Sequence, residues 1–321
     1  MPGSASVFHR LLCLATAVLI RPLLDRVRPS GVALTGLRVL FSLVTMGTAV
    51  GHERAEITRV DLLDADERRV KGEWVRASGV TRRDTAILYL HGGGYISTTA
   101  AHYRGITARL SAITGLPVFA VDYRLAPEHR YPAALQDACA AYHRLSAQGS
   151  RVLIVGDSAG AHLAMALAVE TVLTRSSRPQ ALVLLSPLLD VSCASATELD
   201  RRDKDPMMPP RFVAACSDAL GVDAATTDPR LAVLTADARV LGGLPPTFLV
   251  TGGRECFRGD AHRLHDRLGR IGVYSQHTEV PGHLHDFVLF TKTAASRAVL
   301  RQVADFVTAA GDDRFRAFYG A

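Results

Sequence analysis

The chain has 321 residues, of which 48% are hydrophobic and 21% are charged, and its formal net charge is +6. This composition is typical of a globular protein with one large core, and it favours a single α/β domain with an appended segment over two independent domains. Basic residues stand beside acidic ones, as in DERRV and DRRDKD, and form neither a stripe nor a binding motif, so the positive charge does not indicate a nucleic-acid partner.

The first 54 residues are predicted to form a helical segment. An apolar block runs from Leu11 to Ile20 and ends at Arg21 and Pro22. A block of this length is too short to span a bilayer, and although it would suit a signal peptide, no small-residue cleavage site follows it. We therefore predict an amphipathic helix that rests on the body of the protein, in preference to export or membrane attachment. Together with the next helical stretch, LTGLRVLFSLVTMGTAV, it would make a mobile cap from residues 1–54.

Residues 55–321 are predicted to form the catalytic domain. EITRVDLL and KGEWVRA alternate polar and apolar positions, as antiparallel strands at a sheet edge do. The apolar runs AILYL, PVFAVDY, RVLIVG, ALVLLSP and PTFLVTG follow, separated by helical stretches such as DACAAYHRLSA and AHLAMALAVETVL. This alternation predicts a mostly parallel sheet with helices on both faces. Residues 192–243 show no strand pattern, and we expect them to be an insertion that completes the cap over the active edge of the sheet.

A candidate nucleophile lies in VLIVGDSAGAHLAMAL, which reads as a strand, the pentapeptide Gly-Asp-Ser-Ala-Gly, and a helix. In this setting a tight turn holds the serine in a strained backbone, and the flanking glycines remove side chains that would clash. Ser158 would project its hydroxyl from the turn. A glycine-rich turn without catalysis is the plainer explanation of the pentapeptide, and the strand and helix on either side of it argue against that explanation.

A serine hydroxyl needs a base to take its proton, and in this kind of fold the histidine follows the acid, which follows the serine. His262 and His265 lie on a predicted helix face, where a solvated or capping histidine is expected. VPGHLHDFVLF offers His283 and His285 after a Pro-Gly turn. We favour His285, because the apolar FVLF segment beside it can fix its position by packing, and His283 stays open as the alternative.

The acid is expected after the strand PTFLVTG, where Glu255 and Asp260 compete. Glu255 follows the strand closely enough to lie in a loop that faces the histidine. Asp260 precedes Ala261, at which we expect a helix to begin, and a helix cap is the better explanation of this residue. We therefore predict Glu255 as the acid, with a surface carboxylate as its plainer alternative.

The glycines of AILYLHGGGYIS require a reason, because glycine at the end of a buried strand loses much backbone freedom on folding. Acyl transfer at Ser158 builds an oxyanion, which backbone amides in a water-poor site stabilise well. A glycine run lets the backbone approach the substrate, as in the HGGG loops of lipases and esterases. We therefore predict an oxyanion hole formed by Gly92, Gly93 and Gly94 on one side and the amide of Ala159 on the other.

These motifs resemble those of one family. HGGGY, VDYRLAPEHRYPAAL, GDSAG, LLSPLLDVS and VPGHLHDF, in this order, resemble the bacterial hormone-sensitive-lipase family of α/β-hydrolases from about residue 55 to the end. The resemblance implies hydrolysis of carboxylic esters with small or medium acyl chains, no cofactor, and a cap built from the N-terminus and an insertion. It supports Ser158, the glycine loop and Ala159, and it favours His285 over His283.

The acid position departs from the pattern of the family. Most members carry aspartate in a D-P-L-x-D context, whereas here Glu255 begins the sequence ECFRG. Some relatives have glutamate at this place. We therefore expect a serine carboxylesterase with the set Ser158, Glu255 and His285. A biosynthetic acyltransferase or deacetylase with the same residues is the first alternative, and a ligand receptor on the same fold is the second.

Five scattered cysteines, none of them in a CxxC pair, favour reduced thiols over a disulfide frame or a zinc site. They are Cys13, Cys139, Cys193, Cys216 and Cys256. We therefore expect a cytoplasmic enzyme with no metal site, and the resemblance to the family implies that it needs no cofactor. Its partner would be a small ester, with no nucleic acid, no stable membrane insertion, and a homodimer as a further option.

Overall fold

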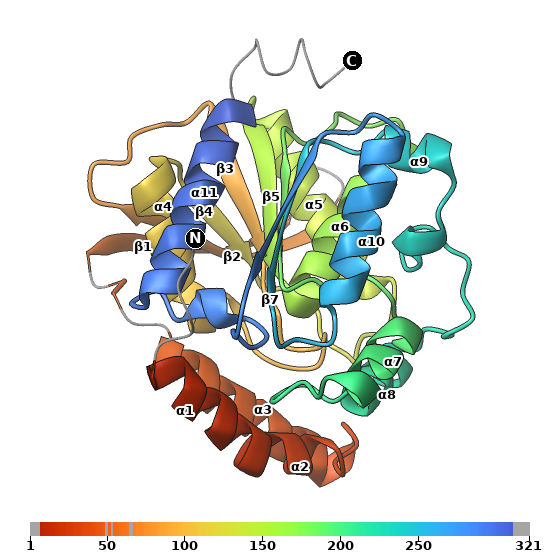
Figure 1. Ribbon diagram of the computed structural model, residues 1–321. Helices are drawn as coiled ribbons and strands as arrows, with labels where there is room; N and C mark the ends of the chain where they lie inside the picture. The colour runs from red at the N-terminus through yellow and green to blue at the C-terminus, as the bar shows by residue number, and fades with distance from the viewer. Residues whose placement is uncertain (1–6, 49–50, 53, 64–66, 311–321) are drawn as a thin grey trace.

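The protein is described here from a computed structural model, which covers residues 7–48, 51–52, 54–63 and 67–310. Parts of the predicted cap and of the C-terminal end, residues 1–6, 49–50, 53 and 311–321, therefore lie outside the described residues. Within the described part, a central sheet is covered by helices on both faces, and a layer of further helices lies at one end (Figure 1).

The sheet has eight strands in the order β1-β2-β4-β3-β5-β6-β7-β8. The strands are β1 Ala55–Leu63, β2 Arg69–Ala77, β3 Thr85–Leu90, β4 Val118–Val121, β5 Arg151–Asp157, β6 Leu182–Leu185, β7 Thr247–Gly252 and β8 Ser275–Val280. β2 pairs antiparallel with both β1 and β4, and all other neighbours are parallel. The predicted antiparallel edge and the five apolar strands are confirmed. β8 is a further strand that the sequence did not predict, because its SQHTEV segment is mostly polar.

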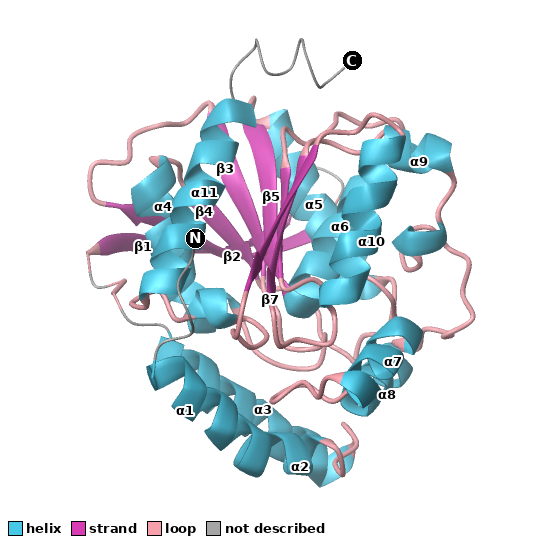
Figure 2. Ribbon diagram, viewed as in Figure 1, coloured by secondary structure: helices cyan, strands magenta, loops and turns pink. Residues whose placement is uncertain are grey.

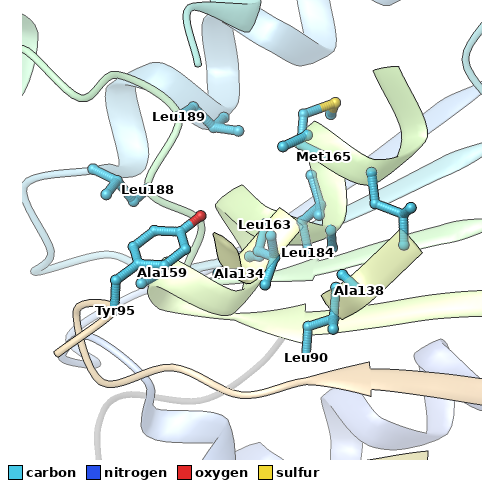
Figure 3. Packing of buried hydrophobic residues seen from close by; sticks show 14 of the residues in the cluster. Leu90, Tyr95, Ala134, Ala138, Ala159, Leu163, Met165, Leu184, Leu188 and Leu189 are labelled. Atoms are coloured by element: carbon cyan, nitrogen blue, oxygen red, sulfur yellow. The ribbon is translucent and has the colours of Figure 1, made fainter. Parts of the chain in front are cut away.

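The core of the molecule consists of two clusters, one on each face of the sheet. The helices that cover these faces are α4 Arg104–Thr114, α5 Ala133–Ala147, α6 Ser158–Leu173, α10 Arg258–Arg270 and α11 Ala294–Ala310. On β3, Ile87 and Tyr89 belong to the cluster that includes α4 and α11, whereas Leu88 and Leu90 belong to the one that includes α5, α6 and α10. Successive side chains of a strand point to opposite faces. Every residue of β3 is accordingly buried. Figure 2 shows helices on both sides of the sheet, and Figure 3 shows Leu90 among the buried side chains of the cluster that includes α5 and α6.

The insertion between β6 and β7 contains helices and loops but no strand, as predicted for residues 192–243. Its helices are α7 Ala194–Arg202, α8 Pro210–Leu220, the short 3-10 helix η3 Val233–Thr235 and α9 Ala238–Gly242. A second 3-10 helix, η2 Ala100–Tyr103, follows the glycine loop, and a third, η4 Phe287–Leu289, lies in the predicted FVLF segment.

The N-terminal segment is helical, as predicted. It consists of α1 Val7–Ala15, a π-helical turn η1 Thr16–Ile20, α2 Arg21–Leu24 and α3 Gly31–Thr48. Two arginines attach it to the main domain. Arg21 forms a bidentate ion pair with Asp200 at 2.8 and 2.6 Å and also donates to the carbonyl of Asp205. Arg38 pairs with Glu128 at 2.8 and 2.7 Å and donates to the carbonyl of Ile96.

One expectation for this segment is wrong. An amphipathic helix would expose a polar outer face, but large apolar side chains are exposed along the N-terminal helices, among them Leu14 at 62% and Leu43 at 64%. The inner face of the helices already meets the main domain, so these outer side chains have no place in the core. In the described residues, no helix is both long enough and apolar enough to cross a membrane.

Candidate active site

The turn between β5 and α6 carries Ser158 in a strained conformation. Its φ is 51°, in the left-handed region that residues with a side chain rarely adopt. The turn is possible because Gly160 packs directly against the backbone carbonyls of Leu90 and His91, where a Cβ atom would collide with them. As the first residue of α6, Ser158 lies at the carboxyl end of β5, the edge at which parallel sheets place their ligands.

Three of the predicted site residues form a continuous hydrogen-bonded chain. Ser158 Oγ lies 2.8 Å from His285 Nε2, although the two residues are 127 positions apart. His285 Nδ1 donates to Glu255 Oε2 at 3.0 Å. The other oxygen of Glu255 accepts a hydrogen bond from the amide of Gly252 at 3.2 Å, which holds the carboxylate against the end of β7. A hydroxyl, an imidazole and a carboxylate in this order are the parts that nucleophilic acyl transfer requires.

The two alternatives lie elsewhere. His283 donates from Nδ1 to the carbonyl of Pro281 at 2.9 Å, and its ring packs at a tilt of 50° against the ring of His9, so it is used in packing. Asp260 pairs with Arg263 at 2.8 Å. The expectation that Asp260 caps a helix is wrong, because α10 begins at Arg258 and Asp260 therefore lies inside its first turn. A negative charge at this place interacts favourably with the positive end of the helix dipole.

The glycine loop lies beside the serine. Gly93 and Gly94 have φ values of 104° and 66°, which glycine adopts without strain. Together with Ala159 they line the cavity in front of Ser158. The amide of Gly92 instead donates to Asp157 at 3.0 Å. Of the three predicted glycines, Gly93 and Gly94 therefore line the cavity, whereas Gly92 fixes the loop to the serine turn.

Sequence reasoning missed Asp286. Its carboxylate oxygen Oδ2 lies 3.4 Å from Nε2 of His285, on the side of the ring that faces Ser158. The residue has a φ of 56°, and its amide donates to the hydroxyl of Ser186 at 3.0 Å. The imidazole is thus flanked by carboxylates at both nitrogens. An acidic residue next to a candidate base was the available signal.

These carboxylates set the charge of the imidazole. Burial by itself lowers the pKa of His285, but the charge of Asp286 and the hydrogen bond to Glu255 outweigh burial and raise this pKa to about 10. Burial also raises the pKa of Glu255, to about 7, although its bond to His285 opposes the change. A perturbed base with identified charge partners inside a cavity is typical of a catalytic site.

The cavity in front of Ser158 has a volume of about 360 Å³ and is mostly apolar. The N-terminal helices contribute Thr16 and Phe41, α8 contributes Phe212, and the loop before η4 contributes His285 and Asp286. The volume lies within the range of about 300–1,000 Å³ that small-molecule sites occupy. The described residues include no group of three His, Cys, Asp or Glu side chains that could hold a metal ion, and their five cysteines are free.

Comparisons with known proteins agree with the fold. A family profile described as alpha/beta hydrolase fold matches residues 87–289. The carboxylesterase/phospholipase LipF of Mycobacterium tuberculosis is 32% identical, over 96% of this chain and 83% of its own. An esterase of Acinetobacter venetianus is 30% identical, over 74% and 79% of the two chains. The solved structure of an esterase from the bacterial hormone-sensitive lipase family superposes with a TM-score of 0.80 at 27% identity, covering 94% of this chain and 98% of that one.

Fold, site and relatives together define a carboxylic ester hydrolase of the α/β-hydrolase class. Within that class, the chain belongs to the bacterial hormone-sensitive-lipase family.

Proposed function

We propose that this enzyme is a serine carboxylesterase that uses Ser158 as nucleophile, His285 as general base and Glu255 as the acid that orients His285. The observation that carries the proposal is the unbroken chain of hydrogen bonds of 2.8 and 3.0 Å from the hydroxyl to the carboxylate. The strained backbone of Ser158 supports the same role, because such strain concentrates at functional sites.

The reaction would proceed in two halves. Neutral His285 accepts the Ser158 proton at Nε2 while Oγ attacks the ester carbonyl, and the carbonyl oxygen becomes an oxyanion facing the amides of Gly93, Gly94 and Ala159. The imidazolium then returns its proton to the leaving alcohol, and the acyl group stays on Ser158. Water then gives a proton to His285 and attacks the carbonyl of this acyl-enzyme. The bond between the acyl carbon and Ser158 Oγ breaks, the imidazolium returns its proton to Oγ, and the carboxylic acid leaves.

The carboxylates of Glu255 and Asp286 stabilise the imidazolium that forms during each half of the reaction. Glu255 fixes the ring from Nδ1, and Asp286 lies close to Nε2, the atom that takes the proton. A negative charge near Nε2 stabilises the charged ring, and the same charge makes the ring harder to deprotonate before the reaction. Asp286 therefore raises the pKa of His285, so that the neutral base forms at a more alkaline pH.

The preferred substrates are esters of short to medium acyl chains, including acetyl esters. The modest volume and apolar lining of the cavity support this range. The N-terminal helices and residues 192–243 would act as the cap, since both contribute side chains to the cavity wall. A cytoplasmic location is part of the proposal and is supported by the five free thiols.

The test is hydrolysis of p-nitrophenyl esters from acetate to palmitate by the purified enzyme beside Ser158→Ala. Turnover that peaks at short or medium chains and is lost in the variant is the expected result. A peak at long chains would overturn the proposed chain length. Turnover that survives in Ser158→Ala would overturn the nucleophile, and no turnover by folded enzyme with any ester would favour an acyltransferase with a special acceptor.

A further inference from the structure

The outer surface of the N-terminal helices is unusually apolar. Of the fourteen large hydrophobic side chains that are exposed in the described residues, eleven belong to these helices. We call this set the outer face, and it consists of Val7, Leu11, Leu14, Val18, Leu19, Leu23, Val32, Val39, Leu43, Val44 and Met46. Single exposed apolar residues are normal, but a concentration of this kind marks a surface that binds something.

The residues of the outer face follow the helical repeat. Along α1 and η1, Val7, Leu11, Leu14 and Val18 are spaced by four, three and four positions, which places them along one side. On α3, the exposed Val32, Val39, Leu43 and Met46 are spaced by seven, four and three positions, with Val44 beside Leu43. The buried Leu34 and Leu37 of the same helix belong to the main core cluster. Each helix therefore has an inner apolar side that packs on the protein and an outer one that packs on nothing in the described chain.

The two stripes meet at the catalytic cavity. Leu19 and Val44 line the cavity in front of Ser158, and they are also 68% and 45% exposed. They come from η1 and α3 respectively, so the cavity wall and the outer face share these side chains. Figure 1 shows the N-terminal helices as a layer across this end of the molecule, on the far side from the C-terminal end of α11.

Basic side chains accompany the outer face. Residues 7–48 contain five arginines and one acidic residue, Asp25. Arg21 and Arg38 are committed to Asp200 and Glu128. The exposed Arg10 lies three residues after Val7 and four before Leu14, so it belongs to the same stripe, and the exposed Arg26 and Arg28 lie in the turn between α2 and α3. Within the described chain, no carboxylate forms an ion pair with these last three arginines.

We infer that the outer face binds an anionic lipid surface, with the helices lying in its plane. An apolar helix side bordered by arginine is the pattern of helices that rest in the headgroup region. A second copy of the chain would bring the three arginines of each outer face against those of the other. The cores of protein interfaces are moreover rich in aromatic side chains and methionine, and ten of the eleven residues of the outer face are aliphatic.

The consequence for catalysis is a direct route from lipid to serine. Because Leu19 and Val44 belong to both surfaces, an ester dissolved in the lipid could reach the cavity without crossing water. The docking itself does not depend on the proposed ester hydrolysis, and its test contains no activity measurement.

The experiment is flotation of the full-length protein with vesicles of phosphatidylglycerol and phosphatidylcholine, and with vesicles of phosphatidylcholine alone. Binding to the mixed vesicles, weakened by salt, is expected. The triple variant Leu14→Glu/Val18→Glu/Leu43→Glu should bind the mixed vesicles at least roughly tenfold more weakly. The double variant Arg10→Gln/Arg28→Gln should bind the mixed vesicles about fivefold more weakly for each arginine removed, because the attraction of one arginine to an anionic surface corresponds to about this factor.

The chain offers a matched control. Leu63, Leu173 and Ile271 are the other three exposed large hydrophobic residues in the described chain. They lie outside the N-terminal helices, since Leu63 ends β1, Leu173 ends α6 and Ile271 directly follows α10. The triple variant Leu63→Glu/Leu173→Glu/Ile271→Glu adds the same three negative charges and should keep most of the binding. Circular dichroism melts of all variants show whether each is folded.

Three outcomes would overturn the inference. The first is wild-type protein that binds neither vesicle. The second is equal weakening by the control triple variant, which would assign the binding to net charge alone. The third is a dimer in size-exclusion chromatography that the Leu14, Val18 and Leu43 substitutions dissociate, which would assign the outer face to a second copy.

Discussion

The site at the end of the sheet and the N-terminal helices that cover it are built on different principles. In the site, most polar atoms have a specific partner, as His285 has in Ser158 and Glu255, and small shifts would break the chain. In the described residues, the N-terminal helices meet the main domain through apolar side chains and through Arg21 and Arg38, which form bidentate pairs with Asp200 and Glu128. Directional bonds give the site one geometry, whereas apolar contact tolerates sliding. The site therefore depends on the geometry of hydrogen bonds, and the N-terminal helices that form its cover depend mainly on apolar contact.

Removal of the imidazole of His285 is expected to have the largest effect on the site. His285→Ala should lower kcat/KM for a p-nitrophenyl ester by roughly 10⁴-fold or more, because base and nucleophile act as one unit. His283→Ala is the matched control, since His283 is also buried and lies two residues away but bonds to Pro281. Equal losses in the two variants would mean that the effect is structural and not catalytic.

The acid gives the next largest effect. Glu255→Gln should lower kcat by about 10³–10⁴-fold at unchanged fold, because the amide cannot stabilise the imidazolium. Asp260→Asn serves as the control, for Asp260 is equally buried but pairs with Arg263. If Asp260→Asn lost the greater share of kcat, Asp260 and not Glu255 would be the acid.

The ion pair between Arg21 and Asp200 tests how the N-terminal helices are attached to the main domain. Arg21→Gln should lower the free energy of unfolding by about 3 kcal/mol, because it leaves the mostly buried Asp200 without its charge partner. Urea unfolding of this variant beside Arg69→Gln measures the effect. Arg69 makes an equally well-formed pair with Asp61 in solvent, where screening leaves little to lose. A loss of stability in Arg69→Gln as large as in Arg21→Gln would contradict the buried pair as the cause.

The smallest expected change is a shift in pH dependence. His285 must be neutral to accept the serine proton, so a raised pKa moves the acidic limb of kcat/KM above the ordinary histidine value. Asp286→Asn removes a negative charge beside Nε2, which lowers the pKa of His285, and the acidic limb should move to lower pH. A limb that stays in place would show that Asp286 does not act on the base. Asp203→Asn, a change of charge at a half-exposed carboxylate that pairs with Arg254 and Arg258, provides the reference profile.

Local sequence was sufficient for the strands, the serine turn and the glycine loop. Each depends on neighbours within a few residues: the apolar runs on burial on both faces of the sheet, and Ser158 on a strand, two glycines and a helix in direct succession. These features satisfy their physical requirements within one short stretch, so their pattern is visible along the chain. β8 escaped prediction because an edge strand needs little apolar surface, and its signal is weak.

The partners of the serine and the surface of the cover were decided by tertiary structure. Sequence could rank His285 above His283 and Glu255 above Asp260, but the hydrogen bonds depend on how segments 30 and 127 positions apart are packed against each other. The proximity of Asp286 to Nε2 depends on its left-handed backbone. The N-terminal stretch is apolar enough to predict helices, yet which apolar side would face the protein and which would face outward is settled only when the helices pack, because burial belongs to the folded molecule.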